Sequence, residues 1–239
     1  MLNAIRMWRA KFSDFVESRR ARSYGWLAIL REIVYVRRTA IIVEKDLSEI
    51  TERLEPLTKC ALEMVEITPG MLSSETYRFA VPSRVLKAWT HLQRGHGGFA
   101  IVRNQMVVGD AWYYGPEAME KPAVIESLRR LGFDTWSKSD VFTLDIYVAP
   151  SERKGGVSAA FQNNAMLALR SKGYSKAFGV YYADDLAAYW CTRVTNRWKE
   201  LRAATVTRFL LLMTFTKEIP LRRVAHGAVK SAEHETRSA

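Results

Sequence analysis

A strand, a glycine-containing loop and a helix follow one another over Phe142–Ser158, and this arrangement constrains the fold more than any other part of the chain. The strand reads FTLDIYVAP and is apolar at most positions, as a buried strand is. Gly155 and Gly156 allow backbone conformations that other residues avoid. The helix that follows begins with N–H groups lacking an intrahelical acceptor, beside Arg153 and Lys154. The segment predicts a phosphate-binding strand–loop–helix.

The loop matches neither of the two common phosphate motifs. It contains no Gly-x-x-x-x-Gly-Lys-Ser/Thr sequence, and it lacks the Gly-x-Gly-x-x-Gly pattern of dinucleotide-binding proteins. Taken alone, the residues are equally compatible with an ordinary strand-to-helix turn whose charges are solvated. Both interpretations stay open at this level.

Hydrophobic periodicity along the chain predicts a mixed α/β or α+β fold. We expect strands at residues 40–43, 99–102, 106–114, 141–148, 177–182 and 201–215. We expect helices at residues 46–66, 82–93, 117–130, 156–172 and 186–191. The strands at 99–102 and 106–114 are separated by a short turn and are predicted to pair as a hairpin.

Residues 1–38 are predicted to form a basic helical arm. They contain nine Lys/Arg and three acids, so they carry six positive charges in excess. Apolar residues recur there at helical spacing, at Ile5, Trp8, Phe12 and Phe15. The arm is expected to pack on the main domain or on a second subunit in a homodimer. The alternatives are an anionic membrane surface and, ranked last, nucleic acid. Residues 39–216 are predicted to form one domain, and residues 217–239 a polar, flexible tail.

Charge and cysteine content narrow the class of protein. The net charge of +11 favours polyanionic partners, including a polyphosphate cofactor or an acidic acyl carrier protein. The two cysteines, Cys60 and Cys191, fit neither a disulfide framework nor a metal-binding spacing, so no metal is expected. The longest apolar run, residues 209–215, is far below the ~20 residues needed to span a bilayer. We therefore expect a cytoplasmic protein, with attachment to the inner membrane face as an alternative.

The loop resembles motif A of the GNAT (GCN5-related N-acetyltransferase) superfamily, whose pattern is Val-x-Pro-x-x-(Arg/Gln)-x-x-Gly-x-(Gly/Ala). Val148, Pro150, Arg153 and Gly156 match it in register. Ser158 stands where the family has Gly or Ala. A small residue is needed there because the helix backbone lies against the pyrophosphate.

The resemblance extends over residues 99–215. The family commonly has Val-x-Gly in the strand before motif A, and residues 107–109 (VVG) fit it. Gly173 and the strand at 178–182 fit the glycine turn and strand expected after motif A. Asp184 stands where Asn is usual in the next motif, and the usual Gly-Phe ending is absent.

The resemblance implies a GNAT-like central mixed sheet flanked by helices, with strand 142–148 splayed from strand 178–182. Coenzyme A would lie in the gap. Backbone groups near Ile146 and Val148 would pair with its pantetheine arm. The pyrophosphate would be held by Arg153 and by the N–H groups of Lys154, Gly155, Gly156, Val157 and Ser158.

The implied reaction is the attack of an amine on the thioester of acetyl-coenzyme A or a longer acyl-coenzyme A, with an acyl carrier protein as an alternative donor. Tyr189 is the candidate acid, and packing in an aromatic cluster is its alternative role. Asp145 is the candidate base and is expected to have a raised pKa because it interrupts an apolar strand. A structural salt bridge is its alternative role. His91 and His96 are expected to be loop residues. A non-catalytic acyl-coenzyme A-binding protein is the alternative function.

Overall fold

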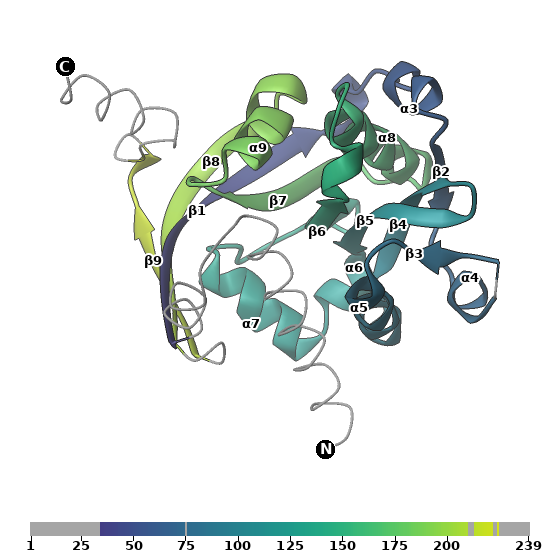
Figure 1. The fold of residues 1–239 in the computed structure, drawn as a ribbon. Coiled ribbons are helices and arrows are strands. Elements are labelled where there is room, and N and C mark those ends of the chain that lie inside the picture. Colours follow the sequence, from purple (N-terminus) through teal and green to yellow (C-terminus); the bar gives the residue numbers. More distant parts are fainter. Residues whose placement is uncertain (1–33, 75, 210–212, 222–223, 225–239) are drawn as a thin grey trace.

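A nine-stranded mixed sheet with helices on both faces makes up the part of the protein that the computed structural model describes, residues 34–74, 76–209, 213–221 and 224 (Figure 1). The strands are β1 (Tyr35–Asp46), β2 (Glu63–Glu66), β3 (Arg78–Phe79), β4 (Gly97–Arg103), β5 (Met106–Tyr114), β6 (Asp140–Val148), β7 (Lys176–Tyr182), β8 (Lys199–Phe209) and β9 (Met213–Ile219). The helices are α3 (Glu55–Lys59), α4 (Pro69–Ser73), α5 (Pro82–Gln93), α6 (Pro116–Met119), α7 (Pro122–Arg130), α8 (Val157–Ser171) and α9 (Leu186–Tyr189). The predicted fold class is confirmed.

The strands follow the order β2-β4-β5-β6-β7-β1-β8-β9, and β3 pairs with β5. β1 therefore lies inside the sheet, antiparallel to both β7 and β8. Its residues Ala40–Val43 are at most 1% exposed. The strand predicted at 40–43 is confirmed, and it is longer than expected. Residues 35–38, predicted as the end of a helix, belong to this strand instead. The rest of the predicted arm lies outside the described residues.

Two other predictions of secondary structure are wrong. The helix expected over residues 46–66 is replaced by a 3-10 turn (Leu47–Glu49), by α3 and by β2. A continuous helix cannot form there, because Pro56 has no N–H to donate and Ala61 adopts a left-handed conformation (φ 51°). The long strand expected at 201–215 is two antiparallel strands, β8 and β9, and the second continues to residue 219, inside the predicted tail.

The sheet buries both faces. Ile41 and Ile42 are adjacent in β1, so their side chains point to opposite faces. Ile41 belongs to the cluster that contains Phe161 and Leu169 of α8. Ile42 belongs to the cluster that contains Leu128 of α7. Helix α5 lies on the α7 side (Figure 1). Its residues Ala88 and Leu92 belong to the cluster that contains Ala100 of β4 and Trp112 of β5.

The predicted splay between β6 and β7 is confirmed. The two strands pair in parallel only from Asp140 to Phe142 of β6, although β6 continues to Val148 and β7 to Tyr182. Beyond this point the Thr143 hydroxyl donates to the Phe178 carbonyl over 3.0 Å.

A β-bulge in β6 accompanies the splay. The register between β5 and β6 shifts between Asp110 and Trp112, so Asp145 and Ile146 share one position opposite β5. Asp145 has a left-handed backbone (φ 44°), which is uncommon for a residue other than glycine. The bulge places Asp145 where the two strands separate.

Candidate functional site

The loop from β6 to α8 is open to solvent and has the backbone that its glycines predict. Gly155 (φ 62°) and Gly156 (φ 79°) are both left-handed and exposed, and a Cβ added at either would meet no atom within 4 Å. The turn before them is braced by an ion pair of 2.8 Å between Glu152 and Arg103 of β4. A ligand can approach the glycine backbone closely from outside.

The first turn of α8 presents its N–H groups beside this loop. Val157 is fully buried and anchors the helix, and its N–H donates to the Lys154 carbonyl over 3.3 Å. The Ala160 N–H donates to the Gly156 carbonyl. The N–H groups of Ser158 and Ala159 precede this first bond, so they form the positive end of the helix dipole.

The backbone edge of β6 faces the gap at the predicted residues. The Ala149 N–H donates to the Val108 carbonyl of β5 over 2.7 Å. Because backbone groups alternate in direction along a strand, those of Val148 and Ile146 point away from β5. The Val148 carbonyl accepts a hydrogen bond of 2.8 Å from Arg153 Nε. Arg153 is therefore tied to the strand edge, and the Ile146 groups remain directed toward the gap.

A small cavity lies against β6 beneath the gap. Its lining is mostly apolar and comes from β4, β5, β6 and α8: Phe99, Ala111, Trp112, Tyr113, Thr143, Ile146, Ala165, Met166 and Leu169. Ile146, whose backbone faces the gap, therefore lines this cavity together with residues of α8.

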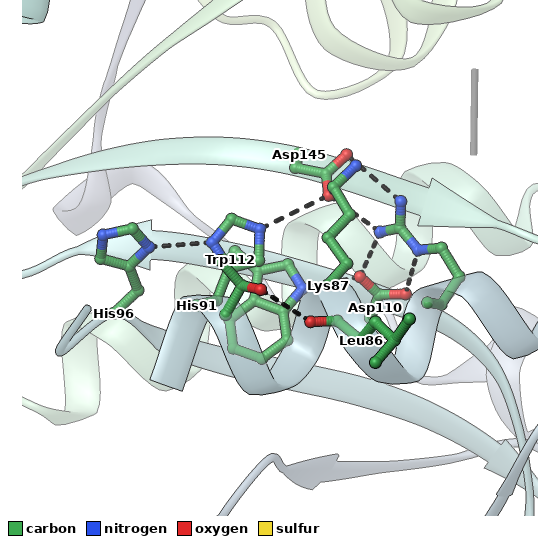
Figure 2. A network of polar contacts seen from close by, with 9 residues as sticks. Leu86, Lys87, His91, His96, Asp110, Trp112 and Asp145 are labelled. Carbon is green, nitrogen blue, oxygen red and sulfur yellow. Dashed lines mark hydrogen bonds and ion pairs between the residues drawn. The ribbon is translucent and has the colours of Figure 1, made fainter. Parts of the chain in front are cut away.

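A network of charged side chains surrounds Asp145 on the side of α5 (Figure 2). Arg84 is 3% exposed and contacts two carboxylates: its Nη2 lies 3.0 Å from Asp145 Oδ2, and its Nε lies 2.9 Å from Asp110 Oδ2. Lys87 Nζ lies 2.7 Å from Asp145 Oδ2. The Trp112 indole N–H donates to Asp110 over 2.7 Å. Two cations and two carboxylates thus balance within the network.

Two histidines extend the network (Figure 2). His91 lies in the last turn of α5 and His96 just before β4, and both are buried. Their Nδ1 atoms are 2.9 Å apart, and His91 Nε2 lies 3.8 Å from Asp145 Oδ2. The His91 ring stacks on Trp112 with centroids 4.6 Å apart. The expectation that both are loop residues is wrong for His91.

The network reverses the pKa shift expected for Asp145. Burial alone would raise the pKa of this carboxyl, but Arg84, His91 and Lys87 together outweigh burial and lower the pKa. The expected raised pKa is wrong because the sequence gives no sign of the cations that α5 brings to Asp145. Burial raises the pKa of Asp110, against the opposing effect of Arg84. Burial and the neighbouring His91, Arg94 and Lys121 lower the pKa of His96 to about 3.

Tyr189, the candidate acid, ends helix α9 beyond the far end of β7. It is half-buried, with its ring centroid 6.4 Å from that of Tyr181 and 6.2 Å from that of Trp190, so it packs in the aromatic cluster expected as its alternative role. Burial raises the pKa of the neighbouring Cys191 thiol to about 12. A catalytic role of Tyr189 stays a prediction.

Arg84, Lys87 and Asp110 are the residues that sequence reasoning missed. Arg84, Lys87 and His91 are spaced by three and four residues in a helix that was correctly predicted, so they share one face. This spacing could have shown a polar face on α5. It could not have shown the carboxylates that the face meets.

Neither metal-binding clusters nor membrane-spanning helices occur in the part of the chain that the structure describes. No group of three or more His, Cys, Asp or Glu residues is arranged there to hold a metal ion. No helix there is long and apolar enough to cross a bilayer.

Comparison with known proteins relates the chain to acetyltransferases through structure alone. No protein-family model and no curated protein matches the sequence. The fold is similar to a GCN5-related glucosamine N-acetyltransferase region of a fungal multi-domain GH3 beta-N-acetylglucosaminidase. The TM-score is 0.52 and the identity 14%, over 81% of this chain and 23% of that one.

Two bacterial structures are similar more loosely. A GCN5-related N-acetyltransferase from Kribbella flavida has a TM-score of 0.43 and 12% identity, over 77% of this chain and 62% of that one. Another from Sphaerobacter thermophilus has a TM-score of 0.44 and 10% identity, over 81% and 56%. The splayed strands, the mixed sheet and the fungal structure agree: this chain has the fold of the GCN5-related N-acetyltransferases.

Proposed function

We propose that the protein is an N-acyltransferase that moves the acyl group of acetyl-coenzyme A, or of a longer acyl-coenzyme A, to an amine. One observation carries the proposal: the β6–β7 ladder ends at Phe142, so the rest of β6 has an open edge, and this edge runs to Val148, where the loop with the left-handed Gly155–Gly156 turn leads into α8. An open strand edge and a helix N-terminus lie side by side. The first suits the amides of a pantetheine arm, and the second suits a pyrophosphate.

The residues present fit such a ligand. The Ile146 backbone faces the gap, and the cavity beside it is lined by apolar side chains. In this proposal the N–H groups of Lys154, Gly155, Gly156 and Ser158 bind the pyrophosphate, and the exposed Arg153 and Lys154 add positive charge. The Val157 N–H instead donates to the Lys154 carbonyl. Coenzyme A would supply the acyl group as a thioester, a good leaving group for attack by an amine. In this proposal Tyr189 donates the proton that the departing sulfur requires.

We propose a role for Asp145 other than the catalytic base that its sequence position suggests. With its pKa lowered by Arg84 and Lys87, it stays ionised and is a weak base. We propose that it holds the ammonium group of the acceptor by charge at the point where β6 splays.

A second candidate function is binding of acyl-coenzyme A without turnover. The observation that favours it is that Asp145 already pairs with Arg84 and Lys87. Asp145→Asn and Tyr189→Phe discriminate between the two. If the protein is an enzyme, both variants should keep their affinity for acetyl-coenzyme A but lose activity. If the wild type and both variants bind acetyl-coenzyme A equally well and none of them turns it over, the protein is a non-catalytic acyl-coenzyme A-binding protein.

Calorimetric titration with acetyl-coenzyme A and longer acyl homologues tests the proposal. Gly156→Leu should abolish binding, because the side chain would occupy the space that the pyrophosphate needs. Gly173→Leu is the matched control: Gly173 follows the other end of α8, is also left-handed (φ 90°) and also has no atom within 4 Å of an added Cβ. Both substitutions cost about 1–2 kcal/mol of backbone strain. Absence of binding of every homologue to the wild-type protein refutes the proposal.

The part of the predicted basic arm that precedes β1, residues 1–34, is proposed to recruit an anionic partner: an acyl carrier protein as donor, or the inner surface of a membrane bearing the acceptor. A cytoplasmic location follows from this proposal. Nucleic acid is the least favoured partner, and a homodimer is an alternative use of the arm. Co-sedimentation with anionic vesicles and binding to an acyl carrier protein, each measured against salt, separate these partners.

A further inference from the structure

An amine of the protein itself lies where the proposed reaction needs one. Lys87 Nζ is 2.7 Å from Asp145 Oδ2, and its side chain is 23% exposed. Asp145 directly precedes Ile146, whose backbone faces the gap between β6 and β7. The ammonium of Lys87 therefore occupies the position at Asp145 that we assign to an acceptor amine, beside the strand edge that would hold the thioester arm.

A nitrogen that can take up a proton lies next to this amine. His91 Nε2 is buried and has no hydrogen-bond partner among the described residues, although it lies 3.8 Å from the same Asp145 oxygen. A separation of 3.8 Å is too long for a hydrogen bond. An amine nitrogen that contacts Asp145 Oδ2 can approach this nitrogen as well, since both groups lie on the side of Asp145 that faces α5 (Figure 2).

One of the two tautomers of the histidine pair leaves His91 Nε2 available as an acceptor, and it is the tautomer that the proposed step uses. The two Nδ1 atoms are 2.9 Å apart, so one of them carries a hydrogen and donates it to the other. His96 is held neutral, with its pKa lowered to about 3 by burial and by His91, Arg94 and Lys121. When the His91 Nδ1–H donates to His96 Nδ1, the Nε2 atom of a neutral His91 has a free lone pair. Histidine is the side chain that most often serves as a general base.

We propose that Lys87 is itself an acyl acceptor, so that the protein acylates its own Lys87 from bound acyl-coenzyme A with His91 as the base. The inference rests on the proposed function, because the acyl group must come from the coenzyme A site.

The step balances without any further reactant. The Lys87 ammonium loses one proton to His91 Nε2, and the neutral amine attacks the thioester carbonyl. The C–N bond forms as the C–S bond breaks. The second nitrogen proton goes to the leaving thiolate, which gives free coenzyme A. The products are an Nε-acyl-lysine at position 87, coenzyme A and a proton on His91.

The exposed fractions of the lysine side chains make acylation of Lys87 testable. Lys59 and Lys199 have side chains that are 73% and 74% exposed, about three times the exposure of Lys87. A reagent that acetylates lysines from solution should modify these two before Lys87. A reaction within the proposed site should reverse the order.

The experiment is peptide mapping by mass spectrometry of the full chain after incubation with acetyl-coenzyme A, beside a sample treated with N-acetoxysuccinimide. With acetyl-coenzyme A, Lys87 should be acetylated about 100-fold faster than Lys59, the lower end of the effect of a general base. With N-acetoxysuccinimide, Lys59 and Lys199 should react first. Acetylation of Lys59 or Lys199 at least as fast as that of Lys87 in the acetyl-coenzyme A sample overturns the inference.

Variants and a binding measurement separate this inference from the proposed function. His91→Gln should slow acetylation of Lys87 about 100-fold, and Lys59→Arg should leave it unchanged. Calorimetry on the same preparation reports acetyl-coenzyme A binding. Binding without acetylation of Lys87 overturns only the inference. Absence of binding overturns the proposed function and the inference together.

Discussion

Replacing Arg84 by Met should destabilise the protein far more than replacing Lys87 by Met. Both cations contact Asp145, but Arg84 also contacts Asp110, and the side chains of that pair are each 3% exposed. Removing one partner of a buried ion pair leaves an uncompensated charge and costs about 3–5 kcal/mol. The Lys87–Asp145 pair is partly open to water, with side chains 23% and 25% exposed, and without Lys87 the Asp145 carboxylate still pairs with Arg84, so the loss should cost about 1 kcal/mol at most.

The difference is large enough to measure by urea unfolding and by thermal denaturation. For a domain of this size, 1 kcal/mol corresponds to about 2–4 °C in Tm, so Arg84→Met should lower the Tm by about 6–20 °C. Lys87→Met should lower it by about 4 °C at most.

The deficit of Arg84→Met should also depend on pH. Burial raises the pKa of Asp110, and without Arg84 nothing opposes this effect as strongly. A carboxyl whose folded pKa lies above its unfolded value destabilises the fold at neutral pH and does so less as pH falls toward 3.8. The deficit should therefore be smaller at pH 5 than at pH 7. Equal losses for the two variants, or a loss that grows on acidification, would refute the account of the network.

Three further measurements probe other parts of the structure. The pKa of His96 is lowered from 6.5 to about 3 in the folded protein, so the wild type should lose stability as pH falls below 6.5, by at most about 1.4 kcal/mol per pH unit. His96→Asn should therefore flatten the dependence of stability on pH. An unchanged slope in the variant contradicts this. Tyr181→Phe should cost about 1 kcal/mol in urea unfolding, because the Tyr181 hydroxyl donates to Glu200 over 2.6 Å; no loss would mean that water replaces the bond. Gly179→Ala should cost about 1–3 kcal/mol, because its Cβ would lie 2.7 Å from the Thr143 hydroxyl, and Thr143→Ala in the same chain should recover part of that loss.

Local sequence patterns correctly predicted the helices and strands around the site. Helix α5 matches the predicted range 82–93, since Pro82 suits its first turn and apolar residues recur at helical spacing. The hairpin of β4 and β5 and the strand–loop–helix of β6 and α8 were also predicted correctly. In each case neighbouring residues alone determine the structure, through turn-forming glycines and apolar periodicity.

Contacts between distant residues could not be predicted in the same way. The direction of the Asp145 pKa shift depends on Arg84, 61 residues away, and on the bulge that turns Asp145 toward α5. The sequence shows Asp145 as a polar residue in an apolar strand. The same pattern would be seen whether its carboxylate is unpaired or paired with a cation. Strand order is equally nonlocal, so the place of β1 between β7 and β8 was not foreseen.

The position of β1 between β7 and β8 affects how the chain folds. Arg38 of β1 pairs with Asp184 after β7, 146 residues further along the chain. During synthesis β1 leaves the ribosome long before either of its neighbours exists, with Ala40–Val43 exposed until β7 and β8 arrive. Closing so long a loop is slow, and an unpaired apolar strand promotes aggregation while it waits. A truncation that reached β1 would divide the sheet in its middle, leaving β8 and β9 without a partner on the inner side.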